Sequence, residues 1–166
     1  MDAATDPPLA IDSRARAALQ RAMALHSSGE IDQALEAGRQ AVDLEPRYAE
    51  AHSYLGNTLV TRKRRFRDGL EAMNRAAELA PGDAAILYTA GWCHEYTANA
   101  LERPRTRHQA VAQNAKTLYA TARDYFLRAL HADPDDQLRG DIEDMLDVVA
   151  AATGEPWEDE GRSLKD

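Results

Sequence analysis

Small and apolar residues recur along this chain at helical spacing, with polar residues between them. Three stretches share a pattern of small residues that ends in proline: ALEAGRQAVDLEP, GLEAMNRAAELAP and ARDYFLRALHADP. Each proline is expected to end a helix, because it lacks an N–H group and disfavours helical geometry in the residue before it. A second amphipathic segment precedes each stretch, so the pattern predicts three helical hairpins.

Small residues also recur at one point in the first helix of each predicted hairpin, at Ala22, Gly56 and Gly91. Two helix backbones can approach closely where side chains are this small. The two-helix pattern recurs as a unit of about 34 residues, and repetition at such a period is typical of helical solenoids.

This unit resembles the tetratricopeptide repeat family. AEAHSYLGNTLV, Ala49 to Val60, follows the first-helix pattern of the family, and GEIDQALEAGRQAVDLEP, Gly29 to Pro46, follows its turn and second helix. The resemblance covers about residues 15 to 134. It implies an all-α, right-handed superhelix whose first helices line a concave groove for a peptide or an extended protein segment.

The predicted domain spans residues 13–153, with repeats at about 15–48, 49–83 and 84–136 and a capping helix at about 136–153. The last helix has one apolar face and one acidic face, which suits the cap that a solenoid needs over its final hydrophobic surface. Residues 1–12 are expected to be disordered, and residues 154–166 are expected to form an acidic mobile tail.

The third repeat is longer than the others. Pro81 and Pro134 lie 53 residues apart, which leaves 19 residues beyond the repeat length. Apolar and small residues continue at helical spacing through Val111 and Ala115, so we expect both helices of the third hairpin to be extended. Sharing the extra residues would add about 14 Å to each helix at 1.5 Å per residue. The sequence thus predicts an elongated third hairpin with Pro104 near its turn.

The family resemblance also assigns residues to the groove, on the first helix of each hairpin. Tyr88, Trp92 and Tyr96 follow one another at four-residue intervals and therefore share one helix face. They either anchor a ligand peptide or are covered by the C-terminal helix or the tail. Asn57 either bonds to the backbone of a ligand or simply faces solvent. The predicted groove residues are Leu19, Met23, His26, Ser53, Asn57, Tyr88, Trp92, Glu95 and Tyr96.

One subfamily binds the C-terminal carboxylates of chaperones through a clamp of lysine, arginine and asparagine side chains. Of the clamp positions, the resemblance matches only Asn57. The other positions need cations or amides, but here they carry Leu19, Met23, Tyr88 and Trp92. A clamp for chaperone tails is therefore not expected.

Basic residues cluster in a chain whose net charge is −8. The turns within the hairpins of a solenoid share one edge, and this edge collects the basic run of the second repeat and three arginines of the third. They form a predicted basic edge: Arg62, Lys63, Arg64, Arg65, Arg67, Arg103, Arg105 and Arg107. The edge is either a solvated surface or a site for an acidic protein, an anionic lipid or nucleic acid. The overall negative charge disfavours nucleic acid.

We find no pattern for catalysis, a metal or a cofactor. The histidines are dispersed, and HEYTA, which begins at His94, lacks the second histidine of a zinc-binding HExxH motif. Cys93 is the only cysteine, so no disulfide can form within the chain, and it is expected to be a buried small residue. No apolar run approaches the roughly 20 residues of a membrane span. The sequence predicts a cytoplasmic protein that is not an enzyme.

These observations predict a protein-binding adaptor with the elongated hairpin as an extra docking surface. Two alternatives stay open at this point. The basic edge could bind an anionic partner, or the chain could act as a self-associating scaffold that forms homo-oligomers. The sequence does not identify the partner.

Overall fold

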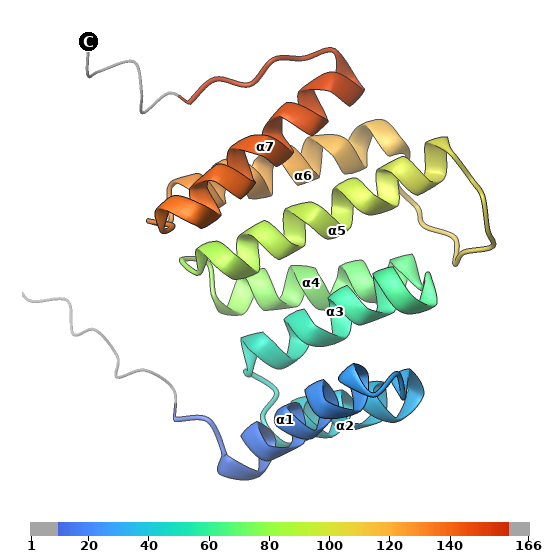
Figure 1. Ribbon diagram of the computed structural model, residues 1–166, viewed down its shortest axis with the longest axis vertical. Coiled ribbons are helices and arrows are strands. Elements are labelled where there is room, and N and C mark those ends of the chain that lie inside the picture. The colour runs from blue at the N-terminus through green and yellow to red at the C-terminus, as the bar shows by residue number, and fades with distance from the viewer. Residues whose placement is uncertain (1–9, 160–166) are drawn as a thin grey trace, which may run out of the picture.

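The computed structural model describes residues 10–159, which form seven α-helices (Figure 1). Three pairs of helices form hairpins, and α7 packs against α6. The predicted all-α fold of three hairpins and a capping helix is confirmed. The helices are α1 Ser13–Ser27, α2 Ile31–Leu44, α3 Ala49–Lys63, α4 Phe66–Leu79, α5 Ala84–Glu102, α6 Ala115–Leu130 and α7 Asp136–Thr153.

Short polar side chains set the starts of several helices. Asp83, Asn114 and Asp135 each accept a hydrogen bond from the backbone N–H three residues further on, at distances of 2.8–3.1 Å. Such caps satisfy N–H groups that have no partner inside the helix. Gly154 takes a left-handed conformation with φ of 74° and ends α7.

The two helices of the second hairpin cross at glycines. A Cβ atom on Gly56 would lie only 2.8 Å from the carbonyl oxygen of Gly69 on α4. In the third hairpin, a Cβ atom on Gly91 would lie 2.7 Å from the ring of Phe126. The predicted close approach at Gly56 and Gly91 is confirmed.

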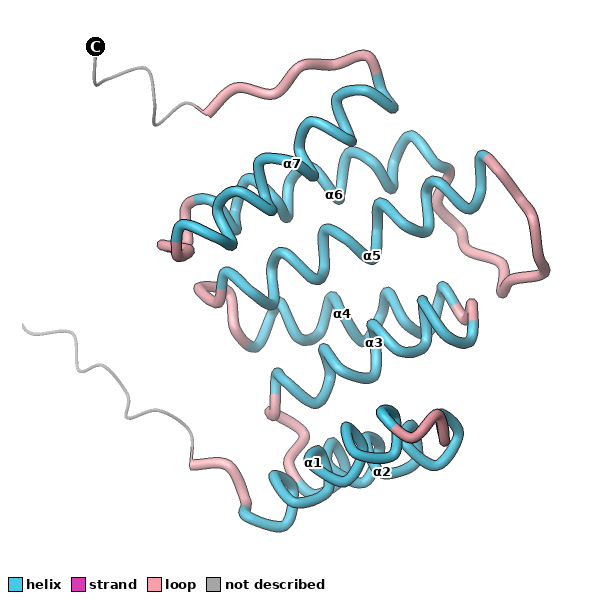
Figure 2. Tube along the Cα trace, viewed as in Figure 1, coloured by secondary structure: helices cyan, strands magenta, loops and turns pink. Residues whose placement is uncertain are grey.

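The turns are sorted onto two edges. Figure 2 shows the turns within the hairpins on one side of the molecule and the connections between hairpins on the opposite side. All eight residues of the predicted basic edge lie in or beside the turns of the second and third hairpins. These residues therefore lie along the same side of the molecule, and a binding role for this edge stays a prediction.

The extra residues of the third repeat lengthen its two helices only slightly, so the prediction that the helices share the whole insertion is wrong. Helix α5 has 19 residues and α6 has 16, against 15 and 14 in the first hairpin. Most of the insertion forms a loop, residues 103–114, which we call the inserted loop. Pro104 cannot continue α5, because it has no N–H group. Asn114 then caps α6, so Val111 lies outside any helix.

The inserted loop folds back onto the turn between α3 and α4. The N–H group of Gln109 donates to the carbonyl oxygen of Arg64 at 3.0 Å. The side-chain oxygen of Gln109 accepts a hydrogen bond from the N–H group of Asp68 at 3.1 Å. His108 stacks on Phe66 with 5.0 Å between ring centroids. The third hairpin is thereby tied to the second instead of projecting from the domain.

The hydrophobic core is unevenly distributed along the solenoid. One large cluster runs from Val60 on α3 to Val149 on α7. The first hairpin and its contact with α3 contain only two small clusters, around Leu19 and Leu35. Within the described residues, no helix is long and apolar enough to cross a membrane.

The described start of the expected mobile tail lies against α6 and α7. Trp157 donates a hydrogen bond from its indole nitrogen to Asp147 at 2.7 Å, and Glu155 pairs with Arg123 at 3.4 Å. These contacts explain why a tryptophan stands in an acidic tail. The remaining parts of the two predicted terminal segments, residues 1–9 and 160–166, lie outside the described residues.

Candidate functional site

The first helices of the three hairpins surround a shallow cavity of about 480 Å³, which we call the central cavity. Helix α1 contributes His26, α3 contributes Asn57, and α5 contributes Tyr88 and Trp92. Four of the nine predicted groove residues thus meet around one hollow, although they come from three separate repeats. Thr61, Arg62 and Thr89 complete its lining.

Packing fixes the aromatic rings of this cavity. Trp92 stacks on Tyr96 with ring centroids 5.3 Å apart, and Tyr88 packs against Phe126 at 5.9 Å. All three stripe residues are half-buried. The aromatic stripe is therefore partly covered by its neighbours, while Tyr88 and Trp92 also line the cavity. Rigid aromatic side chains lose little entropy when a ligand binds to them.

Helix α7 approaches one end of the stripe. Burial raises the pKa of Tyr88, and the carboxylates of Asp141 and Asp144 on α7 raise it further. Tyr88 therefore marks the end of the central cavity that faces the capping helix. Trp92 lies one turn further along α5, toward the edge that holds the turns within the hairpins.

Polar groups of α1 and α3 form the opposite side of the cavity. Asn57 is exposed, and its side-chain oxygen accepts a long hydrogen bond of 3.8 Å from the thiol of Cys93. An amide side chain carries both donors and acceptors, which match the polar groups of a peptide backbone. The Nδ1 atom of His26 lies 3.3 Å from the hydroxyl oxygen of Tyr54, which orients the imidazole ring.

Five predicted groove residues lie outside the central cavity. Leu19 is only 5% exposed and belongs to the core of the first hairpin, so its assignment to the groove surface is corrected. Met23 is 56% exposed on α1, and Ser53 is half-buried on α3. Glu95 is half-buried, and this burial raises the pKa of its carboxyl group. Tyr96 lines a different cavity.

Some cations of the basic edge form ion pairs within the chain, and others do not. Lys63 pairs with Asp32 at 2.5 Å, while Arg65 and Arg67 both pair with Asp68. The side chain of Arg64 donates a hydrogen bond through Nε to the carbonyl oxygen of Arg107 in the inserted loop. Within residues 10–159, the members of the edge that are exposed and form no ion pair are Arg62, Arg103, Arg105 and Arg107.

Part of this edge forms a second, smaller cavity of about 210 Å³. Arg64 reaches it from the turn between α3 and α4, whereas Arg103 and Arg105 reach it from the inserted loop. We call this hollow the arginine pocket. Its other lining residues are Tyr96, Asn99 and Ala100.

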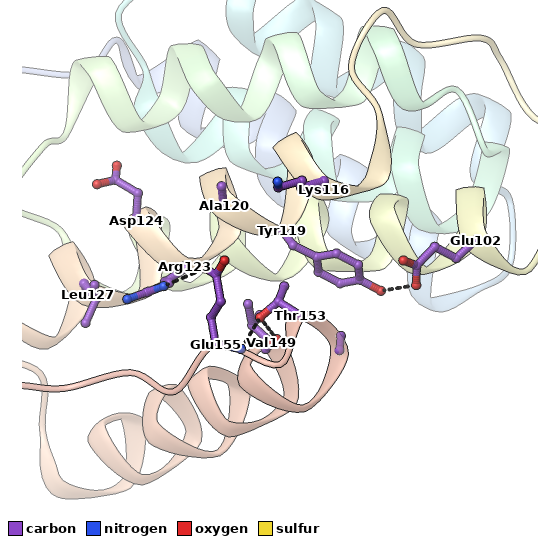
Figure 3. Close-up of a pocket in the computed structure, with 11 residues that line it drawn as sticks. Glu102, Lys116, Tyr119, Ala120, Arg123, Asp124, Leu127, Val149, Thr153 and Glu155 are labelled. Carbon is purple, nitrogen blue, oxygen red and sulfur yellow. Dashed lines mark hydrogen bonds and ion pairs between the residues drawn. The ribbon is translucent and has the colours of Figure 1, made fainter.

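A third cavity, of about 570 Å³, lies between α6 and α7 (Figure 3). Most of its polar side chains form hydrogen bonds or ion pairs within the chain. The hydroxyl of Tyr119 donates to Glu102 at 3.1 Å, and burial together with this carboxylate raises the pKa of Tyr119 to about 12. Arg123 pairs with Glu155 of the tail. The charges of this cavity are therefore largely matched within the chain.

Sequence reasoning did not assign Thr89 and Asn99 to the site. Thr89 lies three residues before Trp92, and Asn99 lies three residues after Tyr96. Helical neighbours at this spacing share a face, so extending the aromatic stripe by this rule would have included both residues. The return of the inserted loop to the groove has no comparable local signal.

The chemistry of the described residues fits binding. Cys93 is fully buried, and desolvation raises the pKa of its thiol to about 12. His94 is also buried, with Nδ1 2.7 Å from the carbonyl oxygen of Ala90. No group of three or more His, Cys, Asp or Glu side chains among residues 10–159 is arranged to hold a metal ion.

Comparison with known proteins agrees with this architecture. The model of the TPR repeat family matches residues 15–61. The first TPR domain of Spaghetti (RPAP3), solved with the HSP90 peptide SRMEEVD, superposes with a TM-score of 0.66 and 14% sequence identity. The similarity covers 87% of this chain and 97% of that domain, and no curated protein matches the chain. Residues 15–61 thus match the TPR repeat family, and the described chain has the fold of a TPR domain.

Proposed function

We propose that the chain is a binding module for a peptide or an extended protein segment, which it holds in the central cavity. The observation that carries this proposal is the convergence of His26, Asn57 and Trp92 from three different hairpins on one hollow. Aromatic side chains fixed by packing supply large contact areas at low entropic cost. The amide of Asn57 supplies hydrogen bonds to a peptide backbone.

The solved structure of the RPAP3 domain supports peptide binding by this fold, because that domain was solved with a bound peptide. Its ligand is not carried over to this chain. In the clamp of the family, the positions of Met23, Tyr88 and Trp92 need cationic or amide side chains. The central cavity instead presents aromatic rings, so we expect its ligand to contribute a large apolar side chain.

The alternatives drawn from the sequence have different support. The inserted loop is folded against the second hairpin, so a projecting docking surface is not part of this proposal. Anion binding along the whole basic edge loses support, because Lys63, Arg65 and Arg67 are paired within the chain. Self-association and a cytoplasmic location stay predictions.

A peptide selection tests the proposal. Phage-displayed random peptides of twelve residues are selected on the full chain, and the affinity of the recovered peptides is measured by fluorescence anisotropy. The sequence contains two tryptophans, so the variant Trp157→Phe leaves Trp92 as the sole indole reporter. Peptide binding should change the Trp92 emission, because the ring lines the cavity.

Substitutions then locate the binding site. Trp92→Ala should weaken peptide binding by about tenfold or more, as truncation of a buried aromatic anchor does in interfaces. Asn57→Ala offers a second, milder change at an exposed position, and Met23→Ala is a matched control outside the cavity. Peptides that bind Trp92→Ala and Asn57→Ala as tightly as the original chain, with unchanged circular dichroism, would refute the proposal.

A further inference from the structure

Three arginines, Arg64, Arg103 and Arg105, line the arginine pocket of about 210 Å³. Arg103 and Arg105 are exposed, and neither forms an ion pair within residues 10–159. Gathering like charges without a counter-ion is unfavourable, and an anion placed among them removes this repulsion. The positive charge of the pocket is thus not neutralised by a carboxylate of the described residues.

The third guanidinium is held in place by the fold. Arg64 has a left-handed backbone with φ of 51°, which is rare for a residue with a side chain. Its Nε donates to the carbonyl oxygen of Arg107 at 3.3 Å, and its guanidinium lies 5.1 Å from the centre of the Phe66 ring. The hydrogen bonds of Gln109 fix the loop that carries the other two arginines. A preorganised cluster costs less entropy when it binds a ligand.

Aromatic contacts connect this pocket to the central cavity. Phe66, beneath Arg64, meets the edge of Tyr96 at 6.3 Å between centroids. Tyr96 lines the arginine pocket and stacks on Trp92, which lines the central cavity. The two hollows are therefore neighbours along α5. Ten helical residues separate Trp92 from the end of α5, or about 15 Å at 1.5 Å per residue, which an extended peptide spans with about five residues.

We propose that the arginine pocket binds the carboxylates of Asp or Glu side chains in the same peptide whose apolar residue occupies the central cavity. Arginine forks match carboxylates in geometry and charge. The inference rests on the proposed function, and it adds a ligand chemistry: an acidic pair about five residues from a large apolar residue. These cations come from the inserted loop and the α3–α4 turn, not from the clamp positions on the first helices.

An acidic protein segment suits the pocket better than nucleic acid does. A nucleic-acid strand presents a long row of phosphates and is bound through many cations. Here three arginines line one small hollow, and the neighbouring cations Lys63, Arg65 and Arg67 are paired with carboxylates. The chain also carries a net charge of −8, which repels a polyanion at longer range.

The test uses the same twelve-residue peptide selection, carried out in parallel on the full chain and on the double variant Arg103→Glu/Arg105→Glu. Arg64 is left unchanged, because its bond to Arg107 holds the loop. We expect wild-type selections to be enriched in peptides with an acidic pair four to six residues from an aromatic or aliphatic residue. The double variant should bind these peptides about tenfold more weakly or worse, and the loss should be largest at low salt.

A charge-matched control separates the pocket from overall charge. The variant Arg47→Glu/Arg75→Glu changes the net charge equally, and both positions are exposed away from the arginine pocket. It should keep the affinity of the wild type within about twofold. Circular dichroism confirms that each variant is folded.

The outcomes distinguish the two proposals. If the selected peptides need Trp92 but bind the Arg103→Glu/Arg105→Glu variant normally, the arginine pocket is not part of the site and the inference is wrong. If no selected peptide depends on Trp92 or Asn57, the proposed function itself fails, and the inference fails with it. If a labelled dT20 oligonucleotide binds through Arg103 and Arg105 while acidic peptides do not, the pocket serves nucleic acid and the inference is overturned.

Discussion

Gln109 caps helix α4 from the inserted loop. Its side-chain oxygen accepts a hydrogen bond from the N–H group of Asp68, which lies in the first turn of α4 and 41 residues earlier in the sequence. The residue at the start of α4, Arg65, makes no side-chain cap of its own. The inserted loop of the third repeat thus completes a helix of the second.

Removing this cap should lower stability. We expect Gln109→Ala to reduce the free energy of unfolding by about 1 kcal/mol, the usual cost of losing a helix cap. Gln113→Ala is the matched control, because Gln113 is exposed in the same loop and makes no side-chain hydrogen bond to a described residue. Urea unfolding followed by circular dichroism measures both. Equal stability of the two variants would show that the Gln109 contact contributes nothing.

The glycine crossing of α3 and α4 should be intolerant of even one methyl group. Alanine favours a helix over glycine by about 1 kcal/mol, yet Gly56→Ala would place a Cβ atom 2.8 Å from the backbone oxygen of Gly69. Backbone cannot move aside as a flexible side chain does, so we expect a net loss of about 1–3 kcal/mol.

A second glycine provides the control for this substitution. A Cβ atom on Gly82, in the connection between α4 and α5, would meet nothing within 4 Å. Gly82→Ala should therefore leave the melting temperature almost unchanged. A Gly56→Ala protein that melts at the wild-type temperature or above would contradict the close packing of the two backbones.

Acid should destabilise the domain through His94. Burial lowers the pKa of this imidazole, and the hydrogen bond to Ala90 offsets only part of the effect. The pKa in the folded state is thus below that of the unfolded chain, about 6.5. The unfolded chain therefore binds a proton at His94 more readily than the folded chain does. The free energy of unfolding is unaffected by this group above pH 6.5 and decreases as the pH falls toward the folded-state pKa.

Urea unfolding at pH 7.5 and pH 5.5 checks this linkage. The wild-type chain should lose more stability between the two pH values than His94→Gln, whose amide does not titrate. The same loss in both proteins would assign the acid sensitivity to other groups.

The thiol of Cys93 should be inert while the domain is folded. It is fully buried, and its pKa is raised to about 12, so very little thiolate exists at neutral pH. Ellman's reagent at pH 8 should release almost no colour from the native protein and one equivalent after unfolding in urea. Prompt reaction of the native protein would indicate that α5 opens readily.

Local signals account for what the sequence predicted correctly. Proline at the ends of the repeats and small residues at Gly56 and Gly91 act within one hairpin, so their consequences can be read along the chain. Helical spacing and family register together placed Asn57 and Trp92 on the helix faces that line the central cavity, while their role in binding stays a prediction. Leu19 was misplaced because it is buried in the cluster that includes Tyr48 and Ala51 at the start of α3, a contact that its own helix does not reveal.

The inserted loop was misjudged for a physical reason. Helical periodicity continued through Val111 and Ala115, and this pattern outweighed the single stop signal of Pro104. The contacts that decide the path of the loop join residues more than 40 positions apart, such as Gln109 and Asp68. No local pattern encodes such a pairing, so the arginine pocket could not be predicted as one site.

The return of the inserted loop also changes how this solenoid should come apart. Repeats in a solenoid touch only their immediate neighbours, and each can melt separately. Here the hydrogen bonds of the inserted loop join the third hairpin to the second. One continuous hydrophobic core also runs through both hairpins into α7. The first hairpin contributes to only two small hydrophobic clusters, and the inserted loop does not reach it. Hydrogen exchange should therefore find two cooperative units, with α1 and α2 exchanging first and α3 to α7 unfolding together in a single step.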